Sequence, residues 1–336
     1  MDAKITKLRL SRMLSYDWLK IVGLCAVAVV VWALIFTMTA TRITPAQQFT
    51  VINYFGNVAA TQNKFAETLS NALSGDVFSY EVIEMTMVDV PGSSEYGSQV
   101  FEARISTSEG DMIFAPDIVN EGSKYEVTVG AQKETRYDSY LQTLMRNCYS
   151  LINLDPNDEN GYFKQMEAFL NGYYEGGYIN GTLNKAKVEK DFRARIKKNK
   201  DKRFKKEAQI QQGVEDEIER IEKYRSALIE FYSYVDSGLV SFTHTVLYDR
   251  NDAEKVLREG VYSINLCPNV DTMGGLKEVA GYLKTHESEN GGESQKVMTA
   301  ENMNVFFLQF DDLEKSFEYE NLLYVNYLIR LVKTNG

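Results

Sequence analysis

Side chains that could act as nucleophiles, bases or metal ligands are few in this chain. It has two histidines, His244 and His286, and three cysteines without CxxC spacing. Because zinc sites are built from sets of histidine and cysteine ligands, these residues do not suggest one. The chain also lacks a nucleophile elbow, a Walker phosphate loop and a GxGxxG segment. We therefore expect a non-catalytic protein, with no catalytic residue, no metal and no cofactor.

The acidic stretch at residues 155–167, DPNDENGYFKQME, resembles a calcium-binding loop. Its glycine, Gly161, comes one place too late, and Met166 stands where such a loop needs a glutamate. The stretch is therefore predicted to be a turn that leads into a helix.

A second set of side chains could bind a small polar ligand without any reaction. Hydroxyl, amide and carboxylate groups follow three apolar stretches of the N-terminal half, where strands are expected to end. The candidate ligand-binding residues are Tyr54, Gly56, Asn57, Ser93, Ser94, Glu95 and Asp117. Each also has a structural explanation: Ser93 and Ser94 can cap a helix, and Tyr54 can belong to the core.

The elements that position these residues follow from hydrophobic periodicity. FTVINYF, from Phe49, is β-branched and aromatic and predicts a strand, and Phe65, Leu69 and Leu73 form one face of a helix over 61–73. The segment 80–90, YEVIEMTMVDV, alternates as a second strand does. A second helix is expected from the Ser93 cap through Ile105.

The stretch ARISTSEGDMIFAPD, residues 103–117, predicts the third unit. Gly110 ends the helix, and the wholly apolar Met112–Ala115 is typical of a strand buried on both faces of a sheet. Three successive βα units predict a doubly wound α/β sheet with right-handed crossovers. In open α/β sheets ligands meet the loops at the carboxyl ends of the strands, which is where the candidate residues stand.

This succession resembles the first lobe of extracytoplasmic solute-binding proteins of the type II periplasmic-binding fold. Weaker similarity continues in YLQTLMRNCYSLINLDP (140–156), in VYSINLCPNVDTMGGLKEVAGYL (261–283), expected to be a returning strand and helix, and in NMNVFFLQF with the helix ENLLYVNYLIRLVKT near the C-terminus. The resemblance implies capture of a small ligand. The polar stretch 284–296 is predicted to be a mobile loop.

The resemblance fails where the second α/β lobe should be. Residues 185–198 predict a basic helix, and a second helix to about Val235 has an apolar seam at heptad spacing, through Val214, Ile218, Ile221, Leu228 and Tyr232. We expect a helical hairpin arm that can open without unfolding the sheet. The predicted organisation is an α/β lobe over 45–156 and 240–336 with a helical region at 157–239.

The N-terminal segment is predicted to cross a membrane. Residues 21–40 are uncharged and apolar over about 20 residues, enough for a helix to span the hydrocarbon core. A cleavable signal peptide is an alternative, although Met38 before Ala40 fits a cleavage site poorly, and lipid attachment at Cys25 is another. Basic residues in the tail at 1–20 place the N-terminus in the cytoplasm and the rest outside the cell membrane.

Charge is distributed unevenly along the chain. Residues 185–206 hold twelve lysines and arginines and three acidic residues, whereas the outer chain apart from this block carries a net charge of about −23. The block could pair with acidic residues of the second helix or meet an anionic partner. A nucleic-acid partner is not expected outside the cell. Cys148 and Cys267 could form a disulfide or remain two buried thiols.

Two functions are consistent with these patterns. The first is a membrane-anchored solute-binding-like protein that captures a small polar ligand or presents it to a membrane partner such as a transporter. The second is a non-catalytic envelope scaffold whose helical arm docks a protein partner.

Overall fold

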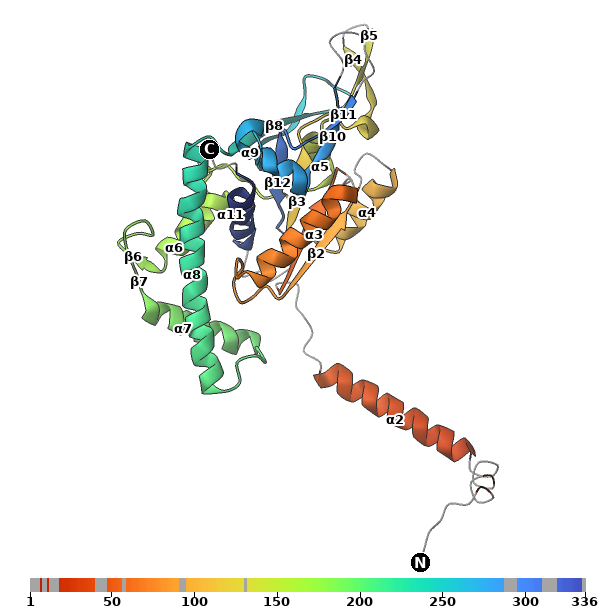
Figure 1. The fold of residues 1–336 in the computed structure, drawn as a ribbon, viewed down its shortest axis with the longest axis vertical. Coiled ribbons are helices and arrows are strands. Elements are labelled where there is room, and N and C mark those ends of the chain that lie inside the picture. The colour runs from red at the N-terminus through yellow and green to blue at the C-terminus, as the bar shows by residue number, and fades with distance from the viewer. Residues whose placement is uncertain are drawn as a thin grey trace, which may run out of the picture. The chain divides into compact units, whose positions relative to one another are not determined.

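A computed structural model describes residues 7, 11, 18–39, 47–55, 59–90, 95–129, 132–286, 295–309 and 319–333. The chain divides into two units, Met1–Thr44 and Pro45–Gly336 (Figure 1). The larger unit combines helices with a central mixed sheet, so the α/β class is confirmed. The finer division of the outer part, at 157–239, stays a prediction.

The apolar N-terminal segment forms the helix α2 (Trp18–Thr39). Its 22 residues span about 33 Å at 1.5 Å per residue. Within the described part of the chain, α2 is the helix that is long and apolar enough, over Trp18–Phe36, to cross a membrane. The predicted single apolar span is therefore present, with its ends shifted by three and four residues.

The central sheet has six strands in the order β2-β1-β3-β12-β9-β8. β1 pairs in parallel with both β2 and β3, whereas β12, β9 and β8 add antiparallel pairings. The parallel half is the predicted one, and the antiparallel half makes the sheet mixed. Its strands are β1 (Gln48–Asn53), β2 (Glu84–Asp89), β3 (Met112–Pro116), β8 (Ser241–Tyr248), β9 (Val256–Asn265) and β12 (Met303–Phe307).

The parallel strands are joined by α3 (Ala59–Ser74) and α4 (Glu95–Ser106). As predicted, β3 is buried along its whole length, because β1 and β12 flank it. Gly110 lies between α4 and β3 with a φ of +122°, and a Cβ there would approach Leu308 Cδ1 to 2.9 Å. Only glycine adopts this backbone freely, which explains the turn into β3.

The remaining helices include the predicted hairpin. They are α5 (Tyr140–Asn147), α6 (Tyr162–Asn171), α7 (Lys185–Asn199), α8 (Glu207–Asp236) and α11 (Glu320–Val332). At the tip, α7 packs on α8 where Phe192 and Phe204 cover Gly213. The second half of α8 is different, because Leu228 and Phe231 belong to the same buried core as the sheet. The hairpin is therefore continuous with the body at its base (Figure 1).

Two predictions about residues 261–296 are wrong. The expected helix after β9 is broken into three short pieces, and 284–296 is not a loop at its ends, because β10 and β11 form an antiparallel hairpin there. Polar residues in both strands, such as Lys284, Thr285, Gln295 and Lys296, hid the two-residue alternation that would have indicated them. Residues 287–294 lie outside the described part of the chain. The short elements are α9 (Val270–Met273), η3 (Gly274–Leu276), α10 (Lys277–Ala280), β10 (Tyr282–His286) and β11 (Gln295–Thr299).

Three other small elements lie between the main ones. A 3-10 turn, η2 (Glu121–Ser123), precedes the hairpin of β4 (Tyr125–Val129) and β5 (Gln132–Arg136). The buried Asp138 fastens this hairpin, because Arg146 and Arg250 both bind its carboxylate, at 3.1 and 2.8 Å. The tiny hairpin of β6 (Tyr174–Glu175) and β7 (Thr182–Leu183) leads into α7.

Candidate functional site

The carboxyl ends of β1 and β3 form the edge at which the candidate ligand residues were expected. β2 lies on one side of β1 and β3 lies on the other, so the connections after β1 and β3 lead in opposite directions. The gap between the carboxyl ends of β1 and β3 is therefore the topological switch point of the sheet. Asp117 follows β3 directly and is exposed, and Glu95 is exposed at the start of α4. The other candidates on loops, Gly56, Asn57, Ser93 and Ser94, lie outside the described residues.

Tyr54 is placed differently from the other candidates. Its side chain is fully buried, and its ring packs on Phe101 of α4 and Tyr140 of α5, with centroids 4.8 and 6.1 Å away. Burial raises the pKa of Tyr54 to about 12, although Ser98 and Asn147 lower it in part. Tyr54 therefore belongs to the core under this edge, and its side chain does not reach the surface.

A turn before β12 brings further polar groups to the same edge, which we call the carboxyl edge. Asn302 has a left-handed φ of +53°. Its backbone carbonyl accepts a hydrogen bond from the Asp117 amide at 2.9 Å, and its side-chain Oδ1 accepts one from Asn265 Nδ2 at 3.0 Å. Asn304, fully buried, accepts from Thr243 and Ser263. The loop after β3 is thus held to β9 and β12 through side-chain and backbone amides.

Charged and aromatic groups stand beside this turn. Lys284 lies 2.6 Å from the Glu301 carboxylate, and the Tyr282 hydroxyl donates to the Glu301 carbonyl at 2.9 Å. The Tyr282 ring contacts Phe55, which follows β1. Burial, with Glu301, Cys267 and Asp117 nearby, raises the pKa of Tyr282. The carboxyl edge can therefore offer carboxylate, amide, ammonium and aromatic groups to one small ligand.

Sequence reasoning missed Tyr282, Lys284, Glu301 and Asn302. The prediction of a helix and a loop over 261–296 removed the first two from consideration. A usable signal was Glu301-Asn302 directly before the apolar run of β12, because asparagine is among the residues that tolerate a left-handed turn.

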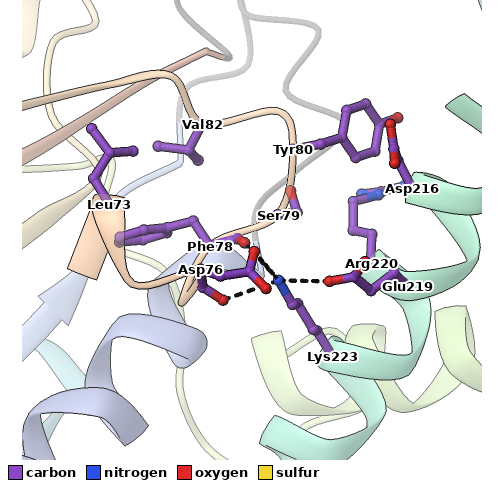
Figure 2. Close-up of a pocket in the computed structure, with 10 residues that line it drawn as sticks. All are labelled: Leu73, Asp76, Phe78, Ser79, Tyr80, Val82, Asp216, Glu219, Arg220 and Lys223. Carbon is purple, nitrogen blue, oxygen red and sulfur yellow. Dashed lines mark hydrogen bonds and ion pairs between the residues drawn. The ribbon is translucent and has the colours of Figure 1, made fainter. Parts of the chain in front are cut away.

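Two cavities in the described part of the chain lie at the opposite, amino edge of the parallel strands, between the α3–β2 loop and α8. One, of about 270 Å³, is lined by Phe78, Tyr80, Arg220 and Lys223 among others (Figure 2). Lys223 crosses it to bind the Asp76 carboxylate at 2.8 Å and the Phe78 carbonyl at 3.1 Å. The second, of about 390 Å³, continues towards α11. Their charged groups are largely bonded to one another.

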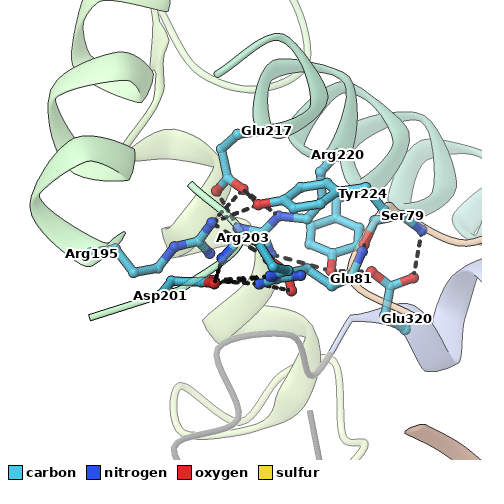
Figure 3. A network of polar contacts seen from close by, with 10 residues as sticks. Ser79, Glu81, Arg195, Asp201, Arg203, Glu217, Arg220, Tyr224 and Glu320 are labelled. Atoms are coloured by element: carbon cyan, nitrogen blue, oxygen red, sulfur yellow. Dashed lines mark hydrogen bonds and ion pairs between the residues drawn. The ribbon is translucent and has the colours of Figure 1, made fainter. Parts of the chain in front are cut away.

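A buried ionic network adjoins the first cavity and joins four elements (Figure 3). Glu217 of α8 binds Arg220 on its own helix and Arg195 of α7, the latter at 2.9 Å. Tyr80 donates to Glu217 at 2.8 Å. Glu320 of α11 accepts from Tyr224 at 2.7 Å and from the Ser79 amide at 3.1 Å. This network fastens the hairpin to the α3–β2 loop and to α11.

The network shifts the pKa values of its two buried glutamates in opposite directions. Burial alone would raise the pKa of Glu217, but Arg220, Arg195 and Tyr80 favour its carboxylate and lower the pKa overall. Burial raises the pKa of Glu320, and its hydrogen bonds from Ser79 and Tyr224 do not offset that effect. Glu320 is therefore the group whose proton the folded state holds more tightly.

Replacing Glu320 by glutamine should change the pH dependence of stability. Because the folded pKa is raised, the contribution of Glu320 is fully present below its unfolded pKa of about 4.3 and is lost as pH rises through the folded pKa. The free energy of unfolding of Glu320→Gln, relative to the unmodified protein, should therefore rise from about pH 4 to about pH 7. Urea unfolding of the full chain in detergent measures this difference. The exposed Glu67→Gln serves as the control, and its difference in free energy of unfolding from the unmodified protein should not change with pH. A Glu320→Gln difference that is equally constant with pH would contradict the prediction.

Cysteine and metal chemistry find little support in the described residues. Cys148 and Cys267 are separate buried thiols, and burial raises the pKa of each to about 11. No group of three or more His, Cys, Asp or Glu residues in the described ranges is arranged to hold a metal. Residues 155–161 form side-chain-capped turns leading into α6, as predicted.

Comparisons with protein-family models, with curated proteins and with solved structures find no match to this chain.

Proposed function

We propose that this is a membrane-anchored, extracytoplasmic solute-binding-like protein that binds a small polar ligand at the carboxyl edge. The observation that carries the proposal is the switch point between β1 and β3, where Asp117, Tyr282, Lys284 and Glu301 gather. A ligand with both a cationic or hydroxyl group and an anionic group suits these side chains. No reaction is proposed, and bound ligand would be presented to a membrane partner such as a transporter.

The proposed location is supported by α2 and its flanks. An apolar helix of this length suits an uncleaved anchor, and the basic tail at 1–20 favours a cytoplasmic N-terminus with the larger unit outside the cell membrane. The ligand edge in this proposal is open, because in the order of the chain helices α6 to α8 replace the second α/β lobe that would close a cleft.

We expect Asp117→Ala to abolish ligand-induced stabilisation of the full chain. The protein in detergent is screened by thermal unfolding against sugars, amino acids, short peptides and divalent metals, and a ligand at 100 times its Kd should add about 2.7 kcal/mol to stability. Asp117 is exposed, so its loss should leave the unliganded melting temperature nearly unchanged. The exposed carboxylate of Glu67, on α3, gives the control variant Glu67→Ala.

Two results would count against ligand binding at this edge. The first is the absence of a shift with every class of compound. The second is a shift that Asp117→Ala and Glu67→Ala affect equally, which would place the ligand elsewhere.

The second candidate, a non-catalytic scaffold, is favoured by one observation. The hairpin is fixed rigidly to the body by the buried network around Glu217 and Arg220, so it offers a stable surface for a protein partner. A ligand screen without any shift, together with a cross-link from exposed Ile229 of α8 to one envelope protein, would favour the scaffold.

A further inference from the structure

In the folded basic block at 185–206, arginines and lysines have different surroundings. Its three arginines are used in ion pairs: Arg193 with Glu207 at 2.6 Å, Arg195 with Glu217 at 2.9 Å and Arg203 with Glu81 at 2.9 Å. All nine of its lysines are exposed. Six of them lie where α7 turns into α8, and we call this group the lysine turn: Lys197, Lys198, Lys200, Lys202, Lys205 and Lys206.

The lysine turn is held at one particular edge of the body. Arg203, within the turn, binds the buried Glu81, and Asp201 braces the Arg203 guanidinium at 2.7 Å. Two residues beyond Glu81, the amide of Ile83 donates to the carbonyl of Gln47 at 2.9 Å. Gln47 immediately precedes β1, at the amino edge of the parallel strands. The lysine turn and the point where the chain enters the larger unit therefore lie at the same edge.

The chain limits how far this edge can lie from the end of α2. Eight residue steps separate Thr39 from Gln47, and a fully extended chain covers at most about 3.6 Å per step, or about 29 Å in all. If α2 crosses a membrane, the amino edge is tethered close to that membrane, whereas β1 carries the carboxyl edge away from the tether.

Charge distinguishes this turn from the rest of the outer chain. Apart from the basic block, the outer chain carries a net charge of about −23, so an anionic surface repels it. Clustered lysines are attracted to anionic headgroups within about a Debye length of 8–10 Å at physiological salt. An anionic membrane would therefore favour the orientation in which the lysine turn faces it.

We propose that the lysine turn contacts anionic phospholipid headgroups of the membrane that holds α2. The inference rests on the anchoring in the proposed function, but not on the ligand. The contact turns the amino edge towards the bilayer and leaves the carboxyl edge open to solvent. The paired arginines make the turn a rigid support that presents its exposed lysines.

The test uses the full chain reconstituted in nanodiscs of neutral phosphatidylcholine or of phosphatidylcholine mixed with phosphatidylglycerol. Acylation of each lysine by a water-soluble reagent is followed by mass spectrometry. We expect Lys205 and Lys206 to react about fivefold more slowly in the anionic discs, and high salt to abolish this protection. Lys124 and Lys133, which lie on or beside the β4–β5 hairpin, should react equally in both lipids.

Two variants, each with four lysines replaced by glutamine, compare loss of charge in the lysine turn with the same loss elsewhere. Replacing Lys197, Lys198, Lys200 and Lys202 by glutamine should remove the protection of Lys205 and Lys206. The same change at four exposed lysines elsewhere, Lys64, Lys124, Lys133 and Lys277, should leave that protection intact.

Other outcomes would overturn the proposal. Equal reactivity of Lys205 and Lys206 in the two lipids excludes a headgroup contact. Protection in both lipids that grows with protein concentration would show instead that the turn docks on the acidic body of a second copy. Failure of the anchor itself is recognised separately, because the chain would then not remain with neutral discs during gel filtration.

Discussion

Replacing Arg220 by methionine should destabilise the folded protein by about 3–5 kcal/mol, because removal of one partner of a buried ion pair leaves the other charge without compensation. The Arg220 side chain is 3% exposed and binds Glu217, which is 6% exposed. It also lowers the pKa of Glu320 in part, so its loss affects both buried carboxyl groups. Since small domains are stable by only about 5–15 kcal/mol, this is a large fraction of the total.

Urea unfolding of the full chain in detergent measures the Arg220→Met effect, and two further variants define its cause. Arg193→Met removes an arginine of the same hairpin whose pairs with Glu189 and Glu207 are at the surface, and it should change stability little. Glu217→Leu combined with Arg220→Met should recover most of the loss, because two apolar side chains need no counter-charge. A double variant as unstable as the single one would refute the ionic explanation.

Placing an aspartate at Ile221 should abolish cooperative unfolding of the whole larger unit. Ile221 is fully buried and belongs to the core that continues into the sheet, and a buried unpaired charge costs several kcal/mol. From sequence alone, charge at Ile218 and Ile221 was expected to open only the arm. The structure changes that expectation, because α8 packs on α6 and α11, and Tyr224, three residues after Ile221, contacts Phe169 of α6 and Glu320 of α11.

The same charge at Phe192 should act locally. Phe192 is nearly as buried as Ile221, but it lies outside the main core, where it packs on Phe204 and Gly213 near the hairpin tip. Phe192→Asp should therefore make the chain sensitive to trypsin at the lysine turn while the body still melts cooperatively.

Limited proteolysis and thermal unfolding of both variants, side by side, distinguish these effects. If Ile221→Asp opened only the tip, α8 would not be part of the body's core. If Phe192→Asp abolished the cooperative transition, the tip and the body would be one folding unit.

Local patterns determined the elements that depend on nearby residues. The order strand, helix, strand, helix, strand over residues 48–116 was predictable, because burial against immediate neighbours produces a period of two or of 3.6 residues. The turn at Gly110, the apolar α2 and the two hairpin helices were predictable for the same reason. The position of the carboxyl edge also followed, since it depends only on the direction of the parallel strands.

Tertiary structure alone decided which distant segments meet. β12 lies antiparallel beside β3, although about 190 residues separate them in sequence, and no local period encodes that partner. The sequence allowed acidic residues of the second helix, Glu217 among them, to pair with the basic block, but it did not predict that Glu217 is buried. Its counter-charges come from Arg220, three residues away on α8, and from Arg195, 22 residues away, and the Tyr80 hydroxyl, 137 residues away, donates a hydrogen bond to it. The local pattern is consistent with both arginine partners, but Tyr80 becomes a neighbour only in the folded chain, so the burial of Glu217 was decided by the tertiary structure.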